Sequence, residues 1–288
     1  MKYQMKRKVL KASIKLMRLD RPVGFWLLLW PTLWALWLAA GGVPPLRWLA
    51  LFTTGVFIMR AAGCVINDYA DRHFDGRVQR TCQRPLPRGE ISEAACLWLF
   101  SGLLLIAGLL LLACNGLTRL LAGIAFLLTL GYPFAKRVTQ LPQVILGFAF
   151  SWSIPMVFAA VTTQLPQPCW LLLLATCCWV VAYDTQYARV DQEDDRKIGI
   201  YSTALLWGGN NAKVIGMLQL MMLGLLVQIG RYYQLGSAFY LSLIAAAGLF
   251  IYQQQLLAYQ QPSKDFSAFT NNQYVGLLIF LGLAFSLS

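Results

Sequence analysis

Charged residues are scarce in this sequence. Of its 288 residues, 12% are Asp, Glu, Lys or Arg, 58% are hydrophobic, and only twelve are acidic. A soluble domain carries about twice that share of charge, so the composition excludes an ordinary soluble globular protein. It predicts a polytopic membrane protein, in which lipid replaces a large soluble core as the environment of apolar side chains.

Side chains that typically bind zinc are also nearly absent. The only histidine is His73, and none of the seven cysteines forms a Cys-x-x-Cys pair. A zinc site of the usual kind needs several such ligands. We therefore exclude one and interpret the cysteines as small apolar residues that pack between helices.

The formal net charge of +12 does not indicate a nucleic-acid partner. Eight of the 24 basic residues precede position 22, and most of the others lie in short loops. This distribution is typical of topology signals and of attraction to anionic lipid headgroups. We expect membrane lipids and no nucleic acid among the partners. We interpret residues 1–22 as a basic cytoplasmic segment and 23–288 as a single transmembrane domain.

Nine apolar runs have the length of a membrane-spanning helix, which needs about 20 residues. They lie at 23–41, 46–66, 93–113, 117–134, 142–161, 168–187, 212–230, 236–256 and 271–287. Twenty Lys and Arg fall on the side that holds the N-terminus and three on the other. The positive-inside rule therefore predicts an all-α protein of nine transmembrane helices with a cytoplasmic N-terminus.

Two loops on the predicted cytoplasmic side hold ten of the twelve acidic residues. Asp71 and Asp191 are 120 residues apart, as are Asp75 and Asp195. The loops follow the second and the sixth run. We interpret this as two four-helix repeats plus a ninth helix, with the active site between the repeats on the cytoplasmic side.

Each acidic cluster presents its oxygens on one face if it is helical. At about 100° per residue the first cluster spans roughly 100° and the second roughly 40°. Their members are Asn67, Asp68, Asp71 and Asp75 in the first and Asp184, Asp191 and Asp195 in the second. Aligned carboxylates repel, and an all-oxygen ligand set favours Mg²⁺. Two facing clusters therefore predict two Mg²⁺ ions that hold a diphosphate.

Basic side chains near the clusters are expected to bind the remaining phosphate oxygens. The candidates are Arg72, Arg77, Arg84, Arg88, Arg137 and Lys197. Arg60 is expected to pair with Asp68 or to point at the phosphate. Two proline residues inside apolar runs, Pro31 and Pro155, are expected to kink their helices.

The acidic stretches resemble known motifs. "NDYADRHFDG" is similar to the NDxxDxxxD motif of the UbiA-type intramembrane prenyltransferases, and "DTQYARVDQEDDRKIGIYST" resembles their second motif, DxxxD. "MRLDRPVGFWLLLWPTLWALWLAAGG" and "RTCQRPLPRGEIS" look like segments of the family's bacterial 4-hydroxybenzoate branch. The second motif departs from the pattern by carrying Glu193 and Asp194 inside it, which leaves open which further acid contributes.

The resemblance implies an activity and a set of site residues. The activity is transfer of a polyprenyl chain from its diphosphate to the carbon ortho to the hydroxyl of 4-hydroxybenzoate, for ubiquinone synthesis at the bacterial inner membrane. The implied Mg²⁺ ligands are Asn67, Asp68, Asp71, Asp75, Asp191 and Asp195, and the implied catalytic residues are Asp71, Asp75, Asp191 and Asp195. For the diphosphate we expect Arg72, Arg137 and Lys197.

The expected substrate contacts are four. Tyr183 and Tyr187 are expected to line the path of an allylic cation. Lys136, with Arg137, is expected to hold the carboxylate of the acceptor, or else only to set topology. Asp184 is expected to orient the phenol or to accept its proton.

Other functions stay open at this stage. The same family could use a naphthoate, a homogentisate or a haem as acceptor. A cation transporter would place its site near the middle of the membrane, whereas these clusters lie at one edge. A CDP-alcohol phosphotransferase would need a DG…AR…G…DxxxD string, which the sequence lacks. No local pattern indicates the prenyl chain length or the oligomeric state.

Overall fold

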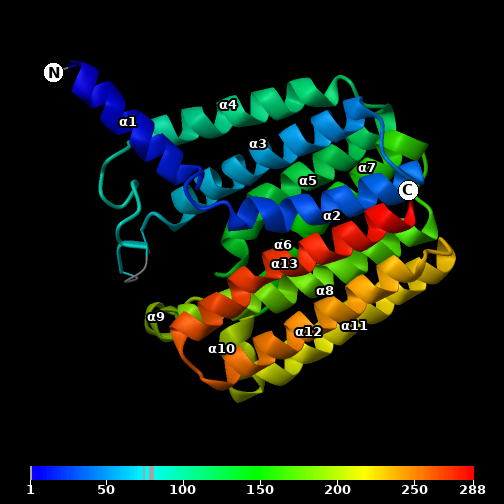
Figure 1. Cartoon of the computed structure of the whole chain (residues 1–288). Helices are drawn as coiled ribbons and strands as arrows, with labels where there is room; N and C mark the ends of the chain where they lie inside the picture. The colour runs from blue at the N-terminus through cyan, green and yellow to red at the C-terminus, as the bar shows by residue number, and fades with distance from the viewer. Residues whose placement is uncertain (1, 74, 78–80) are drawn as a thin grey trace.

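The structure is a computed structural model that describes residues 2–73, 75–77 and 81–288, with the side chains of all of these except 2–8 and 77. Within these ranges every regular element is a helix (Figure 1). The elements are α1 (Lys2–Leu16), α2 (Val23–Ala40), α3 (Leu46–Asp71), η1 (Asp75–Arg77), α4 (Glu93–Leu111), α5 (Gly116–Ala135), α6 (Pro142–Ser151), α7 (Ser153–Thr162), α8 (Gln167–Val190), α9 (Gln192–Ile198), α10 (Thr203–Trp207), η2 (Gly208–Asn210), α11 (Asn211–Tyr232), α12 (Ser237–Ala258) and α13 (Pro262–Ser286).

Nine helical segments among the described residues are long and apolar enough to cross a membrane. Seven are single helices, α6 and α7 together form the fifth, and α10 to α11 form the seventh. The prediction of an all-α protein with nine transmembrane helices is therefore confirmed. The seventh span begins at Thr203 rather than near 212, and α13 begins at Pro262 rather than near 271. Its first turns are polar, and hydropathy alone does not detect them.

The fifth span is interrupted as its proline predicts. Pro155 has no N–H to donate to the carbonyl of Ser151. In a continuous helix its ring would also collide with that carbonyl. α6 ends at Ser151 and α7 begins at Ser153. Pro31, by contrast, lies inside α2 without ending it.

Helix α8 is the most deeply buried of the nine spans, with 72% of its apolar window inside the protein. It packs against α6, α11 and α13, and its Trp179 stacks on Trp34 of α2 with ring centroids 5.3 Å apart. Helix α4 is the opposite case, since only 11% of its window is buried. An apolar exterior of this kind is what lipid contact requires.

A chain of buried amides fixes α8 against the last three spans. Trp179 Nε1 donates to Asn272 Oδ1 at 2.8 Å, and Asn272 Nδ2 donates to Gln186 Oε1 at 2.9 Å. Gln186 and Gln219 both donate to Gln253 Oε1, at 3.0 and 2.8 Å. Hydrogen bonds between side chains of different helices help to hold the helices together in lipid, where apolar surfaces supply little driving force. They set the rotation of α8 and so the direction of its acidic face.

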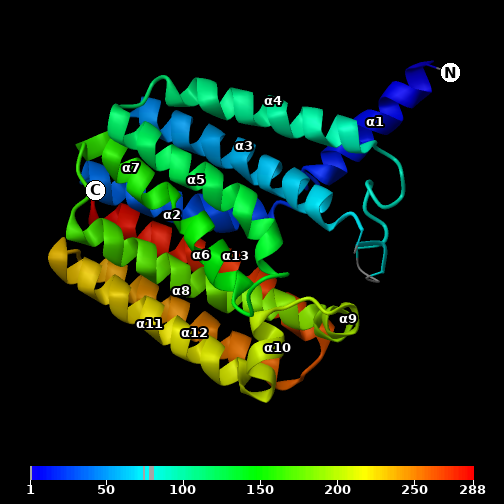
Figure 2. The ribbon, with the colours of Figure 1, turned by 180° about the vertical axis from the view of Figure 1, so that it is seen from behind.

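The segments predicted on the cytoplasmic side gather at one end of the bundle. Figures 1 and 2 show the ends of α3 and α8 there, together with α9, α10 and the N-terminal helix α1. The C-terminus lies at the opposite end (Figure 1). This arrangement brings the two acidic stretches, far apart in sequence, to the same end of the molecule.

Candidate functional site

Neither acidic stretch forms one continuous helix. α3 ends at Asp71, so Asp75 lies in the separate turn η1. α8 ends at Val190, and Asp195 lies in α9. The predicted single helical face is therefore wrong for Asp75 and for Asp184 relative to Asp191 and Asp195, whereas Asp191 and Asp195 keep their helical spacing of four residues. Thr81 Oγ1 donates a hydrogen bond to the backbone carbonyl of Asp75 at 2.8 Å. The backbone N–H of Asp195 donates to the backbone carbonyl of Asp191, also at 2.8 Å.

The turns nevertheless bring both clusters to one cavity of about 140 Å³. Three residues of the first stretch and three of the second line it: Asn67, Asp71, Asp75, Asp184, Asp191 and Asp195. Lys136 and Arg84 line it too. A small chamber with six oxygen-bearing side chains and two cations suits a phosphate group together with a hard cation.

A second cavity of about 630 Å³ adjoins the first. Much of its wall is apolar, with Leu27, Leu28, Met59, Leu146, Phe150 and Phe269 among the lining residues. Five residues line both cavities: Asn67, Arg84, Tyr132, Asp184 and Tyr187. An apolar chamber that joins a charged one fits an amphiphile with an anionic head and a hydrocarbon tail.

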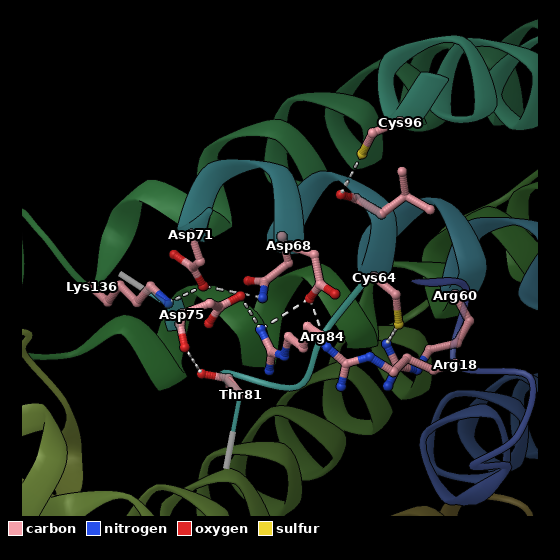
Figure 3. A network of polar contacts seen from close by, with 12 residues as sticks. Arg18, Arg60, Cys64, Asp68, Asp71, Asp75, Thr81, Arg84, Cys96 and Lys136 are labelled. Carbon is pink, nitrogen blue, oxygen red and sulfur yellow. Dashed lines mark hydrogen bonds and ion pairs between the residues drawn. The ribbon is translucent and has the colours of Figure 1, made fainter. Parts of the chain in front are cut away.

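The carboxylates of the first stretch are buried and paired with basic side chains (Figure 3). Asp71 contacts Lys136, and Asp75 Oδ2 lies 2.6 Å from Arg84 Nη1. Burying a carboxylate without such a partner is costly. Burial raises the pKa of the Asp75 carboxyl, while the Arg84 guanidinium opposes that increase. The basic side chains thus offset the negative charge of the buried Asp71 and Asp75 carboxylates.

Asp68 lies apart from the other acids of the first stretch. Its side chain is fully buried but lines neither of the two cavities. Its Oδ1 lies 2.7 Å from Arg18 Nη2 and 3.0 Å from Arg84 Nη1. One position along a helix turns a side chain by about 100°, which directs Asp68 away from its neighbour Asn67. Its Oδ1 holds two arginines, while its Oδ2 is buried without a hydrogen-bond partner among the described residues, so its role as a metal ligand stays a prediction.

Two of the three predicted diphosphate contacts point elsewhere. Arg72 Nε lies 3.0 Å from a carboxylate oxygen of Glu93, at the start of α4. Lys197 is 72% exposed and lies 3.6 Å from Asp194. Neither lines either cavity, because adjacency in sequence to an acid does not place a helical side chain on the same face.

The other basic candidates divide between the cavity rim and the surface. Arg137 lies beside the site, since it donates to the carbonyl of Ala70 and its Nη2 is 3.6 Å from Asp71 Oδ1. Arg88 pairs with Glu90 at 3.3 Å. The side chain of Arg77 lies outside the described residues.

Arg60 does not pair with Asp68. It lines the larger cavity, and its Nη1 lies 2.6 Å from Cys64 Sγ. Arg18 and Tyr132 also line cavities but were not among the predicted residues. Arg18 is 50 positions from its partner Asp68, so no local pattern could reveal the contact.

All four predicted substrate residues line a cavity. Lys136 lines the smaller one, Tyr183 the larger one, and Asp184 and Tyr187 line both. The Tyr187 ring lies 4.8 Å from that of Phe269, centroid to centroid. The hydroxyl of Tyr183 is buried and has no hydrogen-bond partner among the described residues. Their roles stay predictions, and Lys136 lies with the acids of the smaller cavity rather than in the larger one.

The acidic side chains of the site suit a metal ion that binds together with a phosphate group. In the part of the chain that the structure describes, no three acid, histidine or cysteine side chains converge closely enough to bind a metal alone. Asp71 Oδ1, however, is buried and accepts no hydrogen bond from the described residues. Mg²⁺ commonly takes one or two carboxylates and completes its shell with water and substrate phosphates. The donor set fits that mode of binding.

Nine apolar helical segments among the described residues, six of which line a joined charged and apolar cavity, define an integral membrane protein with a candidate site for an anionic amphiphile. The chain belongs to the UbiA prenyltransferase family, whose sequence profile matches residues 28–282. This confirms the resemblance seen in the two aspartate motifs.

Known proteins extend this likeness over nearly the whole chain. The 4-hydroxybenzoate octaprenyltransferase of Klebsiella pneumoniae is 54% identical over 286 residues, which cover 99% of each chain. The apo structure of a UbiA homologue from Aeropyrum pernix K1 is similar with a TM-score of 0.80, at 23% identity, and covers 92% of this chain and 98% of that one. A UbiA homologue from Archaeoglobus fulgidus bound to GPP and Mg²⁺ has a TM-score of 0.68 at 16% identity, and the match covers 96% of this chain and 99% of that one. The two structural likenesses show a shared fold.

Proposed function

We propose that this protein transfers a polyprenyl chain from its diphosphate to the ring carbon of 4-hydroxybenzoate ortho to the hydroxyl. The observation that carries the proposal is the junction of an acid-lined cavity with a larger apolar one at residues of both aspartate motifs. The 54% identity to a 4-hydroxybenzoate octaprenyltransferase supports the same reaction.

The diphosphate lies in the smaller cavity, between the two acidic stretches. Asp71, Asp75, Asp191 and Asp195, with the amide oxygen of Asn67, would hold two Mg²⁺ ions there. When bound, Mg²⁺ neutralises the charge that develops on the departing diphosphate. The relative that binds GPP with Mg²⁺ supports a divalent ion in this fold.

Two basic side chains complete the binding of the diphosphate. Lys136 and Arg84, which pair with Asp71 and Asp75, exchange part of these contacts for phosphate oxygens. Arg84 also reaches Asp68, which keeps its guanidinium at the junction of the cavities. Because Arg binds phosphate oxygens through a planar fork, a fixed guanidinium favours one orientation of the leaving group.

The prenyl tail occupies the larger cavity and the reacting carbon lies at the junction. Breaking the allylic C–O bond leaves positive charge on the carbon, and the ring faces of Tyr132, Tyr183 and Tyr187 stabilise it. All three rings line the larger cavity. The apolar wall also excludes water, which would otherwise capture the cation as a prenyl alcohol.

The acceptor enters the same junction with its carboxylate toward a cation. Arg60 lines the larger cavity and lies against the Cys64 thiol rather than a carboxylate. It can therefore bind the carboxylate of the acceptor there. Asp184 lines both cavities. It accepts the proton from the phenol or from the substituted ring carbon. Loss of the proton from the ring carbon restores aromaticity.

The reaction takes place at the inner membrane of a bacterium and contributes to ubiquinone synthesis. The curated relatives that match are bacterial, and twenty of the basic residues lie on the side of residues 1–22. This charge asymmetry supports a cytoplasmic location for that segment and for the site.

A product assay tests the proposal. Purified protein is incubated with labelled polyprenyl diphosphate and 4-hydroxybenzoate, with Mg²⁺ or with EDTA, beside parallel reactions with a dihydroxynaphthoate and with homogentisate. We expect a C-prenylated 4-hydroxybenzoate that forms only with the metal. Prenylation of another acceptor instead would reassign the substrate, and no metal-dependent product with any acceptor would refute the activity.

A matched pair of variants links the product to the cavity. Lys136→Gln removes a cation that lines the smaller cavity, whereas Lys197→Gln removes one that is 72% exposed. We expect the first to lower kcat/KM at least tenfold, which corresponds to about 1.4 kcal/mol of transition-state stabilisation. The second should retain the activity of the unmodified protein.

A further inference from the structure

Helix α1 lies outside the bundle of spans and presents three different faces. Figure 1 shows it leaving the bundle obliquely at the end that carries both acidic stretches. Ala12 and Leu16 are buried in an apolar cluster with residues of α3 and α4. On the opposite side Leu10 is 61% exposed and Ile14 37%.

The third face is basic. At about 100° per residue Leu10 and Ile14 lie roughly 160° from the buried face, and Lys11 and Lys15 lie between the two. Both lysines are exposed. The sequence adds four more basic residues before position 9, and the first 21 residues hold only one acid. An exposed apolar stripe beside a basic stripe is typical of a helix that lies in the surface of an anionic bilayer.

The end of α1 connects this surface to the site. Two residues after the helix, Arg18 adopts a left-handed backbone conformation with φ of 56°. A residue other than glycine in this region is strained and persists only where its surroundings hold it. Here Arg18 Nη2 lies 2.7 Å from Asp68 Oδ1, and the side chain lines the larger cavity.

The loop that carries Arg84 is part of the same unit. Leu86 and Ile91 of this loop pack in the apolar cluster that also buries Ala12 and Leu16. Arg84 and Arg18 then meet on one oxygen of Asp68. The packing of α1 in this cluster therefore helps to hold both guanidiniums at the larger cavity.

We propose that α1 binds the anionic lipid surface of the leaflet and that this binding keeps Arg18 on Asp68. The partner is the lipid surface, because a bilayer matches the apolar and the basic stripe at once. Anionic lipid stabilises the docked helix, and the docked helix holds the arginine pair in place for an incoming diphosphate. Each lysine close to an anionic surface shifts such a docking equilibrium about fivefold.

The experiment uses the full chain in nanodiscs of phosphatidylcholine alone or mixed with phosphatidylglycerol. The first readout is the rate of tryptic cleavage after Lys11 and Lys15, measured by mass spectrometry. It needs no catalysis, so it stands apart from the proposed activity. We expect phosphatidylglycerol to slow this cleavage several-fold. Equal rates in both lipids would overturn the proposal.

The second readout is the KM for the prenyl diphosphate, which phosphatidylglycerol should lower in the unmodified protein. Lys11→Gln/Lys15→Gln should lose most of this dependence with kcat unchanged. Lys213→Gln/Lys264→Gln removes the same charge from other helices and should keep it. A lipid dependence that is the same in both double variants would contradict the proposal.

Two further samples separate lipid binding from simpler explanations. Leu10→Gln/Ile14→Gln keeps every charge and should also weaken the effect of phosphatidylglycerol, because the apolar stripe no longer enters the bilayer. Soluble glycerol phosphate added to phosphatidylcholine nanodiscs should protect nothing. Protection by the soluble anion would show a binding site for phosphate rather than for a membrane surface and would overturn the proposal.

Discussion

Asp68 and Asp71 lie one turn apart on α3 and meet different partners. Asp71 lines the smaller cavity and contacts Lys136, whereas Asp68 is directed at Arg18 and Arg84. The two carboxylates therefore differ in what their removal should change. In the proposed mechanism Asp71 holds a metal ion, and Asp68 holds the arginines that receive the phosphate.

Asparagine substitutions should separate these roles. Asp71→Asn is expected to lower kcat by roughly 100-fold or more, because a charged group that stabilises the leaving group is lost. Asp68→Asn is expected to raise the KM for the diphosphate about tenfold with a smaller effect on kcat. Steady-state kinetics at several Mg²⁺ concentrations make the comparison. Identical kinetic defects in the two variants would contradict the division.

The sequence revealed the acids of the site and some of its bases, such as Arg84 and Lys136, but it did not reveal Arg18. Asp71, Asp75, Asp191 and Asp195 could be found because acids are rare and the pairs recur at 120 residues. Arg18, Arg60 and Tyr132 face the cavities only through long-range packing. A basic residue at a membrane edge has the same local pattern whether it binds phosphate or sets topology.

At the scale of elements, one ion pair attaches the start of α13 to the end of α8. Asp265 Oδ1 lies 3.1 Å from Arg189 Nη2, and both side chains are nearly buried, at 5% and 10% exposure. Arg189 also donates to the carbonyl of Leu257 at the end of α12. This contact explains why the polar turns at 262–270 are helical although hydropathy does not predict them.

Breaking this pair should destabilise the protein. Asp265→Asn leaves the buried Arg189 without its carboxylate, at a cost of about 3–5 kcal/mol. We expect a clearly lower Tm in detergent. Replacing both residues by apolar ones of similar size, Arg189→Met with Asp265→Leu, should recover much of the loss. A double variant that is no more stable than Asp265→Asn would count against this explanation.

The contact between α2 and α13 depends on a glycine. A Cβ at Gly276 would lie 2.2 Å from Trp30 Cδ1, and the Trp30 ring is itself stacked on Trp26 at 5.3 Å. We expect Gly276→Ala to cost about 1–3 kcal/mol through overpacking. Gly102 of α4 has no atom within 4 Å of such a Cβ, so Gly102→Ala should be neutral or slightly stabilising. Thermal unfolding of the two variants decides, and equal changes in Tm would contradict the packing argument.

The spans were predictable because length and hydropathy suffice to define them, while the short elements were not. The ends of α4 and α5 match the predicted runs within two residues. At η1 Thr81 Oγ1 donates to the carbonyl of Asp75, and near α10 the side-chain amides of Gln192 and Asn211 both donate to the carbonyl of Ala204. These short elements shape the smaller cavity, so its detailed geometry was beyond a pattern-based prediction.

At the scale of the whole molecule, the termini lie at opposite ends of the bundle (Figure 1). Twenty basic residues on one side against three on the other predict that the N-terminus is cytoplasmic. A C-terminal fusion to alkaline phosphatase should therefore be active in the periplasm of a bacterial host, and an equivalent fusion to green fluorescent protein should be dark. A fluorescent C-terminal fusion would reverse the orientation and move the site to the other face.

The joining of the two motifs in one cavity is the feature on which the proposed function depends. Its most direct test is calorimetric titration of Mg²⁺ into the protein in the presence and absence of an unreactive prenyl thiodiphosphate. We predict tight metal binding only with the analogue present, and its loss in both Asp71→Asn and Asp191→Asn, since each supplies one side of the same site. Unchanged metal binding in either variant, or equal binding without the analogue, would contradict a shared site for metal and diphosphate.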